Sequence, residues 1–137
     1  MNAMVLTRPT DRHRCLLRLP ATPAAAAAAR HRVRAALAAW RPPVDPDIAI
    51  LLTSDLVTDA LWRQAGGTIK LVVACADGQL RVEVHGAAPA LPWPADSRNV
   101  PGPGVVLVAK LSDDWGRYRT PEGEAAYLTL AFGGERP

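Results

Sequence analysis

Apolar and polar residues alternate with helical or strand periods along most of the chain. Residues 45–63 carry apolar side chains almost all the way round a predicted central helix. Asp45 is suited to cap this helix because its carboxylate can accept hydrogen bonds from the first free N–H groups, and Pro46 fits the first helical position. Since so little of the helix is polar, we expect it to be buried rather than on the surface.

Two more helices and five strands complete the expected order of elements. The helices run from Pro23 to about Trp40 and from Val105 to about Ser112, and the strands span 15–19, 68–76, 79–85, 115–120 and 125–132. Asp77-Gly78 is typical of a tight hairpin turn between two strands. The order predicts an α+β fold, a two-layer sandwich in which a mixed, mostly antiparallel sheet is covered on one face by three helices.

The strand at 79–85 alternates strictly between apolar and polar residues. Its apolar side chains are expected to face the core: Leu80, Val82 and Val84. The side chains between them are expected to face outward: Arg81, Glu83 and His85.

At 137 residues the chain is long enough for one domain with a real core. We expect this domain at 15–132, between a loose N-terminal arm at 1–14 and a frayed tail at 133–137. Residues 86–104 differ from the rest because they contain five prolines and show no clear period. A segment of this kind in a compact domain is usually functional or disordered, and the first reading makes it a lid over the central helix.

Asp55 and Asp59 are the first candidates for chemistry. They lie four residues apart in the central helix, so both point from the same face. Two like charges at this spacing repel each other, and in apolar surroundings the cost grows unless a cation or a donor answers them. The face is therefore either solvated or the floor of a polar pocket for a metal ion or a phosphate.

Charge is distributed unevenly behind a net charge of +3. Residues 1–41 hold eight arginines against Asp11, a net charge of +7, whereas the remainder has eight basic and twelve acidic residues, a net charge of −4. A basic first third can meet an acidic partner or nucleic acid. It has few aromatic residues and no nucleic-acid motif, so a solvated arginine face is the better interpretation and nucleic acid is not the expected partner.

Hydropathy and cysteine content indicate in which cellular compartment the protein is expected. No segment has the long uncharged apolar run of a membrane span or a secretory signal. Cys15 and Cys75 are isolated thiols without the spacing of a metal site. A cytoplasmic protein with reduced cysteines is the simplest expectation.

The element order and two short sequence segments resemble a known family. These segments are Asp55-Leu56-Val57-Thr58-Asp59-Ala60 and the run from Leu107 to Gly116, LVAKLSDDWG. Over residues 15–132 the chain resembles the anti-sigma-factor serine kinases and their small actinobacterial relatives, members of the GHKL superfamily of histidine kinase-like ATPases. The resemblance implies a Bergerat-type fold that holds Mg-ATP between the central helix and a lid.

The family's helix motif reads Glu-Leu-Val-Thr-Asn-Ala. The resemblance gives Asp55 the place of the Glu, the proposed catalytic base that activates a substrate serine. It gives Asp59 the place of the Asn, which binds the magnesium ion on ATP. Asp55 is one methylene shorter than Glu, and Asp59 could hold Mg²⁺ through its carboxylate but would repel phosphate without the metal.

The other nucleotide motifs depart further from the family. The Asp that bonds adenine falls at Gly86, which has no acceptor side chain, and His85 beside it would point to the other face of the strand. The phosphate loop is retained as Gly102-Pro103-Gly104 before the helix at Val105, although Pro103 removes one N–H donor. In the last hairpin the family's threonine is replaced by Ala125.

Losing these contacts argues against tight ATP binding, because each charge-assisted hydrogen bond is worth about 1.5–3 kcal/mol. Three functions stay open. The first is a degenerate, pseudokinase-like relative that regulates transcription or development through protein contacts. Its expected partner is a sigma factor, an anti-anti-sigma factor or another regulator, and a second copy of itself is an alternative partner. Alternatively the chain is an active Mg-ATP-dependent serine kinase. The third hypothesis is a nucleic-acid or small-molecule binder that uses the basic first third.

Overall fold

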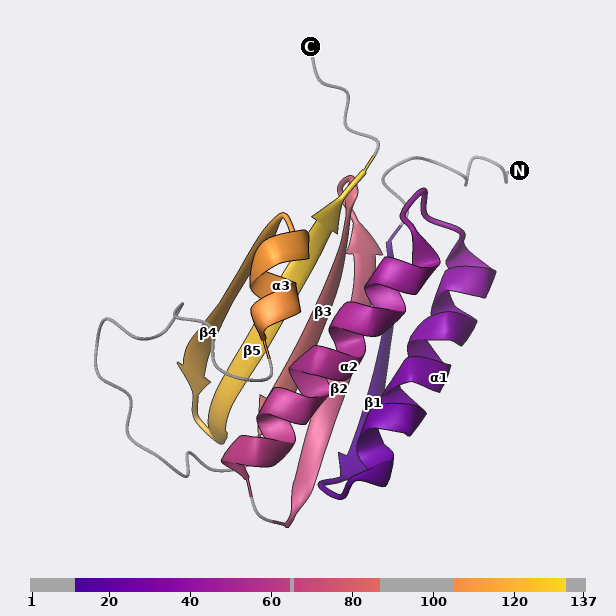
Figure 1. Ribbon diagram of the computed structural model, residues 1–137. Helices are drawn as coiled ribbons and strands as arrows, with labels where there is room; N and C mark the ends of the chain where they lie inside the picture. Colours follow the sequence, from indigo (N-terminus) through magenta and orange to yellow (C-terminus); the bar gives the residue numbers. More distant parts are fainter. Residues whose placement is uncertain (1–11, 65, 87–104, 133–137) are drawn as a thin grey trace.

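Five strands form one sheet with three helices on one of its faces (Figure 1). The computed structural model describes residues 12–64, 66–86 and 105–132. The elements are β1 (His13–Pro20), α1 (Ala24–Trp40), α2 (Pro46–Arg63), β2 (Thr68–Ala76), β3 (Gln79–Gly86), α3 (Val106–Leu111), β4 (Asp114–Thr120) and β5 (Gly123–Ala131). The strand order is β1-β2-β3-β5-β4, and each neighbouring pair is antiparallel. The expected α+β two-layer sandwich is confirmed.

The core lies between the sheet and the helices because the strands alternate as the sequence indicates. Leu80, Val82 and Val84 are buried in the core, so the intervening residues of β3 face away from the helices. In β2 the buried core positions have the same alternation: Ile69, Leu71, Val73 and Cys75. α1 adds its own buried stripe: Ala25, Ala29, Val33, Ala36 and Leu37.

α2 begins with the expected cap. One carboxylate oxygen of Asp45 accepts hydrogen bonds from the N–H groups of Asp47 at 2.9 Å and of Ile48 at 3.4 Å. Pro46 follows as the first helical residue, where its missing N–H costs nothing. These contacts fix where the helix starts.

α2 is less buried than its apolar composition predicts. Trp62 is 77% exposed and Leu51 is 41% exposed, whereas Leu52, Leu56 and Val57 are fully buried. The helix lies over the sheet in a two-layer fold, so no third layer of described residues covers its outer side. The prediction of a fully buried helix was therefore wrong for this outer side.

Several element boundaries differ from the predicted ones by one or two residues. β1 starts at His13 and so includes two residues that the sequence assigned to the N-terminal arm. His13 is fixed by pairing with Cys75 in β2 and by stacking of its ring on Trp40, with 5.2 Å between the ring centres. In the part of the chain that the structure describes, no helix has both the length and the apolar character needed to cross a bilayer.

Candidate functional site

Four charged side chains from α2, β4 and β5 meet between the helix layer and the sheet. Asp59 Oδ1 accepts a hydrogen bond from Arg117 Nη2 at 3.1 Å, and Asp59 Oδ2 accepts one from Arg63 Nε at 3.2 Å. Arg63 Nη1 also lies 3.9 Å from Glu124 Oε2. The side chains of Asp59 and Arg117 are only 5% and 2% exposed. We call this group, Asp59, Arg63, Arg117 and Glu124, the Asp59 cluster.

Local structure places each member of the cluster. Arg63 lies one helical turn after Asp59, so both project from the same side of α2. Arg117 shares the inward face of β4 with Trp115, and its guanidinium lies 5.6 Å from the Trp115 ring centre. Glu124 comes from the start of β5, next to the turn that joins it to β4.

The cluster borders a small, partly open cavity of about 20 Å³, lined also by Gly86, Val84 and Ala125. This volume is enough for one water molecule. Burial raises the pKa of Glu124, although the positive charges of Arg63 and Arg117 oppose the shift. Its Oε1 atom is buried and has no hydrogen-bond partner within the described residues. The site is thus a small recess lined by paired charges.

Asp55 lies one turn before Asp59 and is half-buried. Burial raises the pKa of its carboxyl. Within the described ranges it makes no hydrogen bond or ion pair, so the two aspartates have different surroundings. Arginine side chains balance the charge of Asp59. No described cation does so for Asp55.

Gly86 ends β3 at the edge of the cavity, and Gln64 occupies the space beside it. A side chain at position 86 would bring its Cβ to 2.8 Å from Gln64 Oε1. The Gln64 amide nitrogen is held by the carbonyl oxygens of Gly66 at 2.8 Å and Thr68 at 3.2 Å. An aspartate at position 86 would therefore have to displace an anchored side chain.

The remaining predicted site residues do not gather around this cavity. His85 lies on the opposite face of the sheet, where its Nε2 is 2.8 Å from Glu83 Oε1. Val105 is fully buried in the hydrophobic core at the start of α3. Gly102 and Gly104 lie outside the described residues, as does 87–104 of the proposed lid.

The described residues do not fit a nucleotide-bound magnesium ion. The two arginines within 3.2 Å of Asp59 already neutralise its carboxylate and would repel a divalent cation. Among the residues described, no group of three His, Cys, Asp or Glu side chains could hold a metal ion. A cavity of about 20 Å³ is also far below the roughly 300–1,000 Å³ of ligand pockets.

Sequence reasoning found Asp59 but missed the arginines and the glutamine around it. Arg117 is 58 residues away from Asp59, and only the folded sheet brings them together. A usable signal was present, because alternation in β4 places Arg117 on the same side as Trp115, and a buried arginine needs an acidic partner. No sequence pattern predicted the position of Gln64, because it follows the last residue of α2 and belongs to no periodic element.

Comparison of the chain with protein-family models gives no match. Comparison with curated proteins gives no significant match either.

Proposed function

We propose that this chain is a GHKL-type regulatory protein that has exchanged nucleotide chemistry for protein binding, acting in the cytoplasm in transcriptional or developmental control. The Asp59 cluster is the observation that carries the proposal. In the resemblance, Asp59 stands where a magnesium ligand is expected, yet its two oxygens accept hydrogen bonds from Arg117 and Arg63. This buried ion cluster supports the proposal that Asp59 holds the fold together and does not bind magnesium, and that Asp55 does not act as a kinase base.

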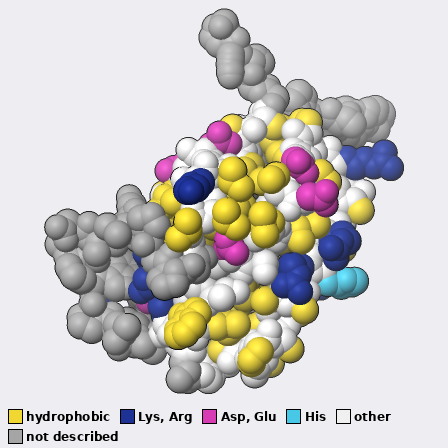
Figure 2. All heavy atoms as spheres, in the orientation of Figure 1, with side chains coloured by type: hydrophobic (Ala, Val, Ile, Leu, Met, Phe, Trp, Pro, Cys, Tyr) yellow, Lys and Arg dark blue, Asp and Glu magenta, His cyan; other side chains and the backbone are white. Residues whose placement is uncertain are grey.

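An exposed apolar surface supports the binding role. Hydrophobic side chains gather over α3 and the first half of α2 (Figure 2). We call the residues Leu51, Val106, Leu107 and Leu111 the α2–α3 patch; each is between 37% and 46% exposed. Contiguous exposed apolar residues are typical of protein interaction sites. Acidic residues flank the patch along the chain, Asp47 before it and Asp113 after it, which suits a partner with a basic rim.

The resemblance supplies the class of partner. It suggests a sigma factor or an anti-anti-sigma factor, bound through the helix layer rather than phosphorylated. A second copy of the chain is the alternative partner, because β1 is an edge strand among the described strands.

A binding assay against purified sigma factors and anti-anti-sigma factors tests this function. We expect one of them to bind, and we expect Leu107→Glu to weaken that binding at least about tenfold, because it places a charge in the apolar contact. Ala38→Glu is the matched control, since it adds the same charge at an exposed position of α1. Circular dichroism of both variants checks that they fold.

Two results would contradict the proposal. One is that no sigma factor or antagonist binds in the absence of nucleotide. The other is that the partner is phosphorylated when ATP and Mg²⁺ are added, which would identify the chain as the active kinase instead.

A further inference from the structure

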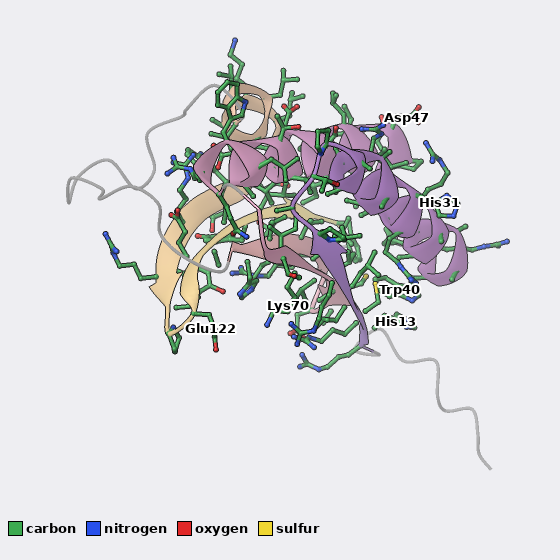
Figure 3. All side chains as sticks on the ribbon, turned by 90° about the horizontal axis from the view of Figure 1, so that it is seen from below. His13, His31, Trp40, Asp47, Lys70 and Glu122 are labelled. Atoms are coloured by element: carbon green, nitrogen blue, oxygen red, sulfur yellow. The ribbon has the colours of Figure 1, made fainter. Side chains whose placement is uncertain are left out.

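The face of the sheet opposite the three described helices presents a row of basic side chains. Arg18 in β1 pairs directly with Lys70 in β2, and Lys70 pairs with His85 in β3. The neighbours of these residues in each strand belong to the core, so alternation turns all three side chains to the other face. Figure 3 shows Lys70 on the side of the sheet away from the helices. The row is set by strand register and does not depend on a flexible loop.

A hollow of about 230 Å³ lies over this row. Its lining consists of Arg18, Thr68, Ile69, Lys70, His85, Gly86 and Glu122. Glu122, in the turn between β4 and β5, supplies the acidic side chain of the lining. The hollow therefore has two positive side chains, Arg18 and Lys70, and one negative side chain, Glu122. Its net charge is positive even when His85 is neutral.

The two cations have no acidic partner within the described ranges. The ion pairs in this part of the chain involve other arginines and His85. Like charges directly opposite each other on neighbouring strands repel and destabilise a sheet. Since register holds Arg18 opposite Lys70, an anion between them would remove this repulsion.

The Glu83 carboxylate beside the row already has hydrogen-bond and charge partners of its own. Glu83 accepts hydrogen bonds from Arg81, from Tyr118 Oη at 2.6 Å and from the ring nitrogen of His85 at 2.8 Å. Burial alone would raise its pKa, but these hydrogen bonds and the charge of Arg81 outweigh burial and lower the pKa to about 2. Glu83 therefore neither pairs with Arg18 or Lys70 nor repels an anion strongly.

We propose that the hollow over Arg18, Lys70 and His85 binds the phosphoryl group of a small phosphomonoester. A phosphoryl group carries nearly two negative charges at pH 7 and several strong acceptor oxygens, which match one guanidinium and one ammonium group side by side. The volume lies below that of pockets for drug-sized ligands, so a small phosphate ester fits it better than a nucleotide. This proposal is independent of the proposed function, since it uses the other face of the sheet.

The test is a titration of the isotope-labelled full chain with inorganic phosphate at constant ionic strength, followed by amide chemical shifts. We expect saturable shifts at Ile69, Lys70 and Gly86. Arg18→Ala and Lys70→Ala should each weaken binding at least about tenfold, because each removes a charge-assisted contact. Arg14→Ala is the matched control, since it removes the same charge from the same strand and face but does not line the hollow. Glu122→Gln should strengthen binding.

Glycerol 3-phosphate and phosphoserine then serve as probes of the ligand class. The proposal expects both to compete with inorganic phosphate, whereas acetate at the same ionic strength should not. It is overturned if phosphate gives no saturable shifts, or if Arg14→Ala weakens binding as much as Arg18→Ala. It is also overturned if only a single-stranded oligonucleotide binds, with an affinity that falls steeply with salt.

Discussion

Asp59 shows how one buried carboxylate depends on its neighbours. Two charges taken from water are tolerated only when they are paired and hydrogen-bonded. Arg117 and Arg63 provide both kinds of contact, at 3.1 and 3.2 Å. Asp55, one turn earlier on α2, is half-buried and makes no such contact with a described residue.

Replacing these two aspartates should therefore have unequal effects. We expect Asp59→Ala to lower the free energy of unfolding by about 3 kcal/mol, because it removes the carboxylate that accepts hydrogen bonds from the buried Arg117 and from Arg63. Asp55→Ala should change it by less than about 1 kcal/mol, since it removes a carboxylate that burial already disfavours in its charged form. Urea denaturation of both variants at pH 7 measures the difference. Equal losses would mean that the Asp59 cluster does not stabilise the fold.

Glu83 should make stability depend on acid pH. Its pKa is lowered from an ordinary value of 4.5 to about 2 in the folded chain. A lowered pKa stabilises the fold above the unfolded value, and this stabilisation is lost as the pH falls from about 4.5 to about 2. With its side chain 14% exposed, we expect a contribution of about 2 kcal/mol.

Denaturation of the wild type and Glu83→Gln between pH 7 and pH 2 measures this contribution. The stability difference between them should shrink across that acid range, because the variant has no carboxyl to protonate. A constant difference at all pH values would show that the hydrogen bonds to Glu83 do not favour its ionised form.

At the scale of elements, caps and turns made most of the structure predictable. Asp45 and Pro46 placed the start of α2, and Asp77-Gly78 placed the β2–β3 hairpin, where both residues have positive φ values of 55° and 78°. The start of β1 was missed because His13 and Arg14 are polar and belong to no apolar pattern. Their strand conformation comes from pairing with β2, which only the folded chain supplies.

The cap of α2 gives an element-scale prediction. Asp45→Ala should cost about 1 kcal/mol of stability, because two N–H groups lose their acceptor. Asp47→Ala is the control: it removes a negative charge from the same helix end without removing the cap, so its cost should be about 0.5 kcal/mol. Thermal denaturation of the two variants ranks them. A larger loss for Asp47→Ala would show that charge, and not capping, fixes this end.

At the scale of the whole molecule, the two faces of the sheet have separate surroundings. The helix side holds the Asp59 cluster and the α2–α3 patch, and the uncovered side holds the basic row of Arg18, Lys70 and His85. Sequence pattern predicted the two layers because alternation and periodicity are local. It did not predict which charges meet, since the contact of Arg117 in β4 with Asp59 in α2 forms only when the sheet and the helix layer pack together.

We propose that the Asp59 cluster takes the place where a GHKL-type protein would hold the magnesium ion of ATP. Calorimetric titration of the purified chain with ATP up to millimolar concentration, with and without Mg²⁺, tests it most directly. We expect no saturable heat in either titration, because Asp59 is paired with two arginines and the cavity beside it is about 20 Å³. Saturable binding that requires Mg²⁺ and disappears in Asp59→Ala would contradict the proposal and identify the chain as a protein that binds Mg-ATP.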